Sequence, residues 1–306
     1  MAKLLLADRV KDRATTFLGP LIPVLERHYD VRFLSAGPGP ALAQAIDWAD
    51  IVWLEWCWDH AVWATNNRCL VGKRCVLRLH SIEALQTDFP ARVDWTRVDR
   101  LIAVGEDIAD VLRINTPAAP SPAIIWNGID LDHFAPGHGD RYRVAWVGHL
   151  EPKKNPMLLL QIAYALHRVD PRYSVHVAGG FTDLRTARYT KQMMASLGLA
   201  GILRFEGTIA DMPAWYSDKG VLLSTSMYES FGLNIGEAMA VGAFPVVHDF
   251  PGAGSLWPEE CLFASIEQAV ALIRSAQIGL YRTWIADRYG LEKQQTAVLR
   301  LLADLA

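Results

Sequence analysis

The chain has 306 residues, of which 51% are hydrophobic and 21% are charged, and its formal net charge is −3. This length and composition indicate a folded globular protein with one large or two medium domains. The basic residues are scattered and form no polybasic run, so we expect no nucleic-acid partner.

The sequence also gives an expectation about location. Its beginning, "MAKLLLADRVKD", soon becomes charged, which is unlike a signal peptide, and no apolar run approaches the length of a transmembrane helix. We therefore expect a cytoplasmic protein with no transmembrane segment, and peripheral attachment to a membrane stays open.

Cysteine and tryptophan are the two residue types with an informative distribution. The four cysteines form no CxxC pair and no zinc spacing, so we predict buried, reduced thiols. Five of the eleven tryptophans lie in "DWADIVWLEWCWDHAVWA", which is compatible with core packing or with a stacking surface. We favour the core.

The first half of the chain alternates apolar strand patterns with helical patterns. Such alternation predicts a parallel, doubly wound sheet with right-handed crossovers. The expected strands are 3–7, 30–35, 50–56, 73–80, 100–105 and 123–128, and the expected helices are 18–29, 41–49 and 106–114.

A turn-rich segment, "NGIDLDHFAPGHGDR" at 127–141, is the best candidate for a linker. The alternation then starts again. Strands are expected at 142–148, 173–180, 202–207, 220–226 and 244–250, and helices at 155–169, 186–198, 211–218, 232–242, 268–276 and 291–306.

This pattern predicts an α/β protein with two Rossmann-like domains, whose parallel sheets face each other across a cleft. We place an N-terminal domain at 1–130 and a C-terminal domain at 131–306. Packing of the last helix back on the N-terminal domain stays open. Because open α/β folds bind ligands at the carboxyl ends of their strands, residues at strand ends are the candidate site residues.

Two glycine turns in the second domain follow predicted strands. Gly148, His149 and Lys154 lie in "VGHLEPKKN", and Gly179 ends a second strand in "VAGG". A lysine ammonium beside a glycine turn suits a diphosphate. The alternative is that Lys153 and Lys154 are solvated loop charges. There is no GxxxxGK[ST] and no GxGxxG motif.

The most informative stretch is "STSMYESFGLNIGEAMAVGAFPVV" at 224–247. If a helix begins near Gly232, the backbone N–H groups of Phe231, Gly232 and Leu233 form an anion site. Glu229 then lies just before the helix and Glu237 one turn inside it. Carboxylates beside a phosphate site suit the hydroxyl groups of a ribose or hexose, so the stretch predicts a nucleotide-sugar site.

These residues resemble a known family. "YESFGLNIGEAMAVGAFPVV" resembles the E-x7-E signature of retaining GT-B glycosyltransferases (glycosyltransferase family 4-like, group 1), and "WNGIDLDHFAP" is similar to their inter-domain segment. "VAWVGHLEPKKNPMLLL" and "FEGTIADMPAWYSDKGVLLSTS" are similar to two further family segments, so the resemblance covers nearly all of 123–255. The first domain resembles the family only in its alternation of strands and helices. Its segment "LHSIEAL" stands where the family has the histidine of the cleft.

The resemblance implies a glycosyltransferase that moves a sugar from a nucleotide diphospho-sugar to an acceptor, with retention at the anomeric carbon. It implies no cofactor and no metal, because Lys154, His149 and the helix N-terminus take the charge of the leaving diphosphate. It assigns Glu237 to the ribose hydroxyls and Glu229 to the donor sugar, and it places His80 across the cleft near sugar and acceptor. The acceptor, whether a glycan, a lipid-linked molecule or a small molecule, is not specified.

The chain departs from the family pattern at three places. His149 stands where the family has arginine, Asn155 replaces a glycine, and the first domain is short and lacks the usual Gly-Gly loop. Glu55 and Glu83 are only candidates for a catalytic nucleophile. Two alternatives remain at this point: a nucleotide-sugar epimerase on the same fold, and a non-catalytic sugar- or nucleotide-binding protein.

Overall fold

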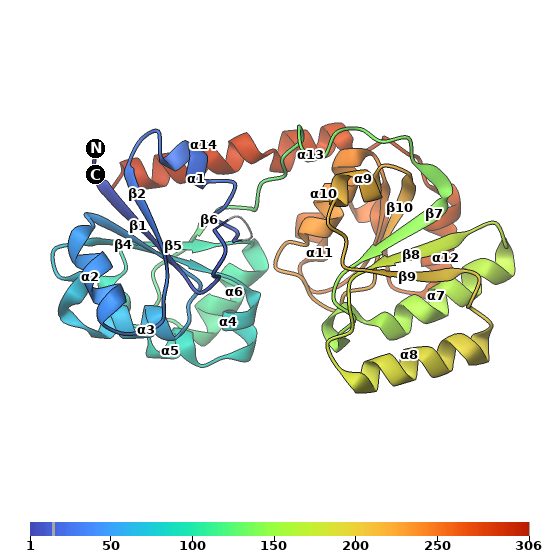
Figure 1. The fold of residues 1–306 in the computed structure, drawn as a ribbon, viewed down its shortest axis with the longest axis horizontal. Helices are drawn as coiled ribbons and strands as arrows, with labels where there is room; N and C mark the ends of the chain where they lie inside the picture. Colours follow the sequence, from blue (N-terminus) through green and yellow to red (C-terminus); the bar gives the residue numbers. More distant parts are fainter. Residues whose placement is uncertain (14–15, 306) are drawn as a thin grey trace. The chain divides into compact units, whose positions relative to one another are not determined.

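The structure is a computed structural model that describes residues 1–13 and 16–305. The chain divides into two compact units. The first contains Met1–Gly128 together with Leu291–Ala306, and the second contains Ile129–Gly290 (Figure 1). Each unit has its own six-stranded parallel sheet. In the described residues, no helix is long and apolar enough to cross a membrane.

The sheet of the first unit has the strand order β2-β1-β3-β4-β5-β6, and all of its pairings are parallel. Its strands are β1 Lys3–Asp8, β2 Asp30–Ser35, β3 Ile51–Glu55, β4 Arg74–Leu79, β5 Arg100–Ala103 and β6 Ala123–Ile124. Its α-helices are α1 Ile22–Leu25, α2 Pro40–Trp48, α3 Asp59–Asn66, α4 Ser81–Gln86, α5 Phe89–Arg92, α6 Glu106–Asn115 and α14 Leu291–Ala303, and Arg68–Leu70 and Trp95–Arg97 are 3-10 turns.

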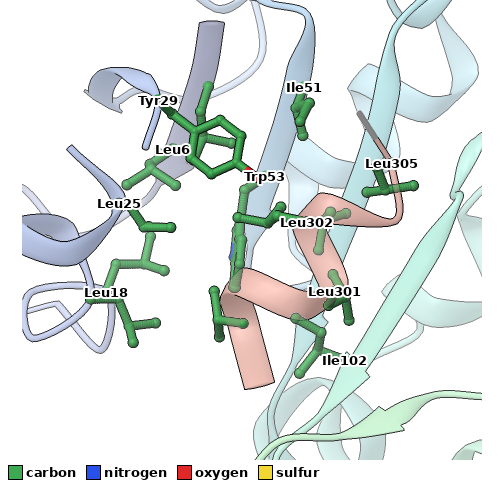
Figure 2. Close-up of a cluster of buried hydrophobic side chains, with 14 of the residues drawn as sticks. Leu6, Leu18, Leu25, Tyr29, Ile51, Trp53, Ile102, Leu301, Leu302 and Leu305 are labelled. Atoms are coloured by element: carbon green, nitrogen blue, oxygen red, sulfur yellow. The ribbon is translucent and has the colours of Figure 1, made fainter. Parts of the chain in front are cut away.

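Helix α14 supplies part of the core of the first unit. Leu301 and Leu302 lie in one buried cluster with Leu6 and Trp53 of the central strands (Figure 2). Residues far apart in the sequence therefore share one core, because β1 and β3 are neighbours and α14 covers their apolar face. Such contiguous burial is the main stabilising contribution to a unit of this size.

The sheet of the second unit has the order β12-β11-β10-β7-β8-β9. Its strands are β7 Asp140–Val147, β8 Ser174–Ala178, β9 Leu203–Gly207, β10 Lys219–Ser224, β11 Phe244–His248 and β12 Leu262–Phe263. Its α-helices are α7 Pro156–Val169, α8 Leu184–Leu197, α9 Met212–Tyr216, α10 Leu233–Val241, α11 Ala253–Leu256, α12 Ile266–Ser275 and α13 Arg282–Tyr289, and Pro152–Lys154 and Glu259–Cys261 are 3-10 turns.

The segment expected to be a linker is bound to the second unit. The guanidinium of Arg282 donates to the carbonyl oxygens of Leu131 at 3.0 Å and Phe134 at 2.8 Å. Gly137 N donates to Val241 O at 2.8 Å, and His138 N donates to Ser217 O at 2.7 Å. Composition indicated turns here correctly, but the turns belong to a packed unit.

The tryptophan-rich stretch is not one feature. Trp53 is fully buried, whereas Trp56 and Trp58 are half-buried and their rings lie 5.5 Å apart. The preference for core therefore holds for Trp53 and is wrong for these two. Of the cysteines, Cys57, Cys75 and Cys261 are buried and Cys69 is half-buried, and all four are free thiols.

Candidate functional site in the second unit

Two glycine turns lie at the carboxyl ends of β7 and β8. Gly148 and Gly179 have φ values of 156° and 133°, which disfavour other residues. A Cβ on Gly179 would lie 2.0 Å from the carbonyl oxygen of Gly148, so the two turns need a glycine to approach each other. A Cβ on Gly148 would lie 3.2 Å from Cδ and Cε of Lys154. The lysine side chain thus runs across the first glycine turn.

Asn155 explains how the chain does without a glycine after Lys154. Its φ of 51° lies in the left-handed region, which asparagine tolerates better than most residues. Its Oδ1 accepts a hydrogen bond from Leu158 N at 3.3 Å and so caps α7. The replacement keeps the turn that presents Lys154.

Glu229 is the centre of the site. Its side chain is only 7% exposed, and it accepts from the ammonium of Lys154 and from Ser226 Oγ, the latter at 2.7 Å. The ammonium of Lys153 lies 3.6 Å from its Oε2. Burial would raise the pKa of Glu229, but the two lysine charges and these hydrogen bonds hold it below its ordinary value. Glu229 is therefore a buried carboxylate.

The loop that carries Glu229 is fixed to the turn that carries the lysines. Met227 N donates to the carbonyl oxygen of Lys153 at 2.9 Å, and Thr225 Oγ1 donates to that of Lys154 at 2.8 Å. Trp146 Nε1 in β7 donates to the same threonine hydroxyl at 2.9 Å. These three hydrogen bonds hold the loop of Glu229 against the turn of Lys153 and Lys154.

Helix α10 begins where the sequence predicted. Gly232 is its N-cap residue, with a φ of 90°, and Leu233 is its first residue. Phe231 is 1% exposed and its ring packs against Trp257. Only its backbone is therefore a candidate for contact with a ligand. Asn234 Nδ2 donates to Val147 O at 3.0 Å, which ties the start of α10 to the end of β7. The helix N-terminus therefore lies at the strand end that carries Gly148.

Glu237 lies one turn inside α10 and differs from Glu229. It is half-buried, and in the described ranges its carboxyl group has no hydrogen bond or ion pair. Burial raises its pKa from 4.5 to about 7. The two glutamates thus differ in charge state, because the pKa of Glu229 is lowered by its lysine partners whereas burial raises that of Glu237 to about 7.

His149 is the weakest member of the predicted set. Its side chain is exposed, and its carbonyl oxygen accepts from Glu151 N at 2.9 Å. Its role toward a diphosphate remains a prediction. Within residues 1–13 and 16–305, no group of three histidine, cysteine, aspartate or glutamate side chains is arranged to hold a metal ion.

His80 belongs to the first unit, directly after β4. Its Nε2 lies 2.8 Å from Glu55 Oε1, and the ring of Trp56 stacks on it with centroids 4.0 Å apart. Burial would raise the pKa of Glu55, but the charge of Arg78 and the hydrogen bond from His80 outweigh burial and lower it. An ionised carboxylate only accepts, so Nε2 of His80 carries the proton. Trp56 has a φ of 71°, an uncommon value for tryptophan.

Sequence reasoning missed the rest of this network. Arg78 is 1% exposed, lies 3.6 Å from Glu55 Oε1, and donates to Asn127 Oδ1. Glu55 also accepts from Trp53 Nε1 at 2.9 Å. Glu83, the other nucleophile candidate, accepts from Cys57 N at 2.8 Å, and burial raises its pKa. An arginine inside the otherwise apolar strand "RCVLRL" was the signal that could have revealed the network.

Comparisons with known proteins identify similar sequences and similar folds. Residues 129–258 match the model of the family "Glycosyl transferases group 1". The chain is 34% identical over 175 residues to the D-inositol 3-phosphate glycosyltransferase of Salinispora arenicola, a match that covers 49% of this chain and 39% of that protein. A match of 35% over 169 residues to the Geodermatophilus obscurus protein of the same name covers 49% and 37%. The chain thus spans well under two thirds of these relatives.

Solved structures resemble the chain over nearly its whole length. Anabaena HepE in complex with UDP has a TM-score of 0.79 at 16% identity, covering 99% of this chain and 100% of that one. Sucrose-phosphate synthase from Thermosynechococcus elongatus has a TM-score of 0.77 at 16% identity, covering 100% and 99%. These likenesses confirm the predicted fold class, α/β with two Rossmann-like domains in the GT-B arrangement of elements. In sequence, the match to the model of the glycosyl transferases group 1 family is confined to residues 129–258, which lie in the second unit.

Proposed function

We propose that this protein is a retaining glycosyltransferase, which moves a sugar from a nucleotide diphospho-sugar to an acceptor without a metal ion. The proposal rests on one observation, the buried Glu229 paired with Lys154 beside the N-terminus of α10. The match of residues 129–258 to the group 1 family model supports it, and so does the complex of HepE with UDP-glucose, which the chain resembles in fold.

The proposed donor site has three parts. The diphosphate binds at the N-terminus of α10, where Gly232 and Leu233 offer backbone N–H groups and the helix dipole favours an anion. Lys154 adds a charge-assisted contact from the facing turn, and the glycines at 148 and 179 let the ligand approach the backbone. Together these groups stabilise the negative charge of the departing diphosphate.

The sugar and ribose hydroxyl groups are assigned to the two glutamates. Glu229 is ionised and already held in one orientation, so it accepts hydrogen bonds from the donor sugar, where charge develops during transfer. Glu237 accepts from the ribose hydroxyls, which do not change during transfer. His80, oriented by Glu55, keeps its predicted catalytic role as a proposal.

A thermal-shift panel tests the donor proposal. UDP, GDP and ADP and their glucose conjugates are added to the full chain in the presence and absence of EDTA. One nucleoside diphosphate should raise the apparent melting temperature equally in both conditions, because a ligand of the native state stabilises it by mass action. No stabilisation by any of them would contradict the proposal, and loss of the effect in EDTA would contradict metal independence.

A product assay then separates transfer from other chemistry. Incubation of the selected donor with candidate acceptors should release nucleoside diphosphate only when an acceptor is present, and the new glycosidic bond should keep the anomeric configuration of the donor. Conversion of the donor to its epimer without acceptor would instead identify an epimerase.

A further inference from the structure

Two neighbouring lysines of the second unit reach the same buried carboxylate. Lys154 binds Glu229 Oε1, and the ammonium of Lys153 lies 3.6 Å from Oε2. Adjacent residues usually point their side chains apart, but here the 3-10 turn Pro152–Lys154 turns both toward Glu229. The bond from Met227 N to the carbonyl oxygen of Lys153 fixes that turn.

The two lysines are held differently. Oε1 of Glu229 accepts from Lys154 and from Ser226, which uses both of its lone-pair directions. Lys153 lies beyond hydrogen-bond distance of Oε2 and is 30% exposed, against 16% for Lys154. Lys154 is therefore a fixed partner of the acid, whereas Lys153 is a loosely paired cation at the edge of the same site.

The charges of this cluster do not balance. Two ammonium groups face one carboxylate, and the charges of both lysines lower the pKa of Glu229. One positive charge is left over beside the N-terminus of α10, which itself favours an anion. A nucleotide diphospho-sugar carries one negative charge on each of its two phosphates, and Lys154 alone leaves one of them without a permanent counter-charge. Position 149 holds a histidine, so the permanent charge that a guanidinium would bring there is absent.

We propose that Lys153 is a second donor-binding cation, whose ammonium moves from Glu229 to the diphosphate when the donor binds. The movement leaves Glu229 Oε2 free to accept a hydroxyl group of the sugar, while Lys154 and Ser226 keep the carboxylate in place through Oε1. This inference rests on the proposed donor site and names a residue that sequence reasoning had treated as a solvated loop lysine.

Isothermal titration of the full chain tests the assignment. The wild type, Lys153→Gln and Lys153→Arg are titrated with UDP, UDP-glucose and uridine, or with the GDP or ADP series if that base gave the larger thermal shift. Lys191→Gln, on the exposed side of α8, is the matched control for the loss of one positive charge. Far-UV circular dichroism and the melting temperature of each variant show that it is folded.

The expected result is a roughly tenfold loss of UDP and UDP-glucose affinity in Lys153→Gln, the scale of one charge-assisted contact. Uridine affinity and the Lys191→Gln control should change less than twofold, and Lys153→Arg should regain most of the lost affinity. Because an ionic contact is screened, the difference between wild type and Lys153→Gln should shrink as salt rises.

Three results would overturn the assignment, and they are distinguishable. If the wild type binds no nucleoside diphosphate, the proposed function fails and this inference fails with it. If the wild type binds and Lys153→Gln binds equally well, Lys153 has no role in the donor site while the proposed function stands. UDP-glucuronate is titrated as well. If Lys153→Gln lowers the affinity for UDP-glucuronate alone, the lysine binds a carboxylate on the sugar instead of the diphosphate.

Discussion

Glu55 Oε1 lies 2.8 Å from His80 Nε2, and both side chains are buried at the carboxyl ends of the neighbouring parallel strands β3 and β4. The same carboxylate faces the buried guanidinium of Arg78 at 3.6 Å. One acid thus orients the candidate cleft histidine and also neutralises a charge inside the first unit.

Replacing that acid should cost stability. Glu55→Gln leaves the Arg78 charge buried without its counter-ion, so the free energy of unfolding at pH 7 should fall by about 3–5 kcal/mol. Urea denaturation measures it, with Glu292→Gln on the exposed surface of α14 as control. The pKa of Glu55 is lower in the folded state, so its stabilisation is present above its ordinary value of 4.5 and is lost as pH falls through the folded value. A difference between the two proteins that does not narrow at acidic pH would contradict this account.

The pair formed by Lys154 and Glu229 should show measurable coupling. A double-mutant cycle of Lys154→Met and Glu229→Gln should give an interaction energy of about 1–3 kcal/mol in unfolding experiments, because both partners are largely screened from water. The exposed pair Arg113–Asp110, at 2.9 Å, is the control and should give only about 0.2–0.5 kcal/mol. Equal interaction energies in the two cycles would mean that burial does not strengthen the ion pair of Glu229 with Lys154.

Glu237 should make stability fall as pH rises through neutrality. Its folded pKa of about 7 exceeds its ordinary 4.5, so the contribution of the neutral carboxyl is complete below pH 4.5 and is lost as pH rises through 7. Glu237→Gln should therefore match the wild type near pH 5 and exceed its free energy of unfolding by about 1–3 kcal/mol at pH 8. Glu229→Gln, whose parent carboxyl has a lowered pKa, should instead be less stable than the wild type at pH 8. Parallel pH profiles for the wild type and Glu237→Gln would exclude this titration.

Kinetics should separate the two acids if the proposed donor site is correct. Glu237→Gln should mainly raise the donor KM, because it removes binding that is the same in ground and transition states. Glu229→Gln should mainly lower kcat, because it contacts the sugar whose charge develops. Free nucleoside diphosphate is the control, and its affinity should fall in Glu237→Gln and stay nearly constant in Glu229→Gln. The reverse pattern would exchange the two roles.

Most of the sheet strands were predictable because their signal is local. Strands such as Asp30–Ser35 and Leu203–Gly207 are short apolar or alternating runs between turn residues, and the structure places them within a residue of the expected bounds. The helix expected at 18–29 was wrong, since only Ile22–Leu25 is helical. Pro20 has no N–H to donate and precedes the helix, whereas Pro23 lies in its first turn. Five further helices, α3, α4, α5, α11 and α13, were not predicted, because each has at most eight residues and too few turns to show a helical period.

The candidate site was predictable where a motif was contiguous, and not where it was assembled in space. The start of α10 was predicted because Glu229, Gly232 and Glu237 lie within one short stretch. The contact of Lys153 with Glu229 was not predicted, because the turn that carries Lys153 is fixed by a hydrogen bond from Met227, which is 74 positions along the chain from it. The bond between Glu55 and His80 depends on the pairing of β3 with β4, which no local pattern specifies.

The chain passes between its two units twice, and the two passages are neighbours. Gly128 N donates to Gln294 Oε1 at 2.8 Å, and the next residue, Ile129, donates through its N–H to Tyr289 O at 2.8 Å. The second unit is thus an insertion into the first, between β6 and α14. During synthesis on the ribosome, all strands of the second unit emerge before α14 does, so the second unit is able to complete its fold before the first. Until α14 emerges, the part of the cluster around Leu6, Trp53 and Ile102 that Leu301 and Leu302 cover stays exposed, and such transiently exposed apolar surface favours aggregation.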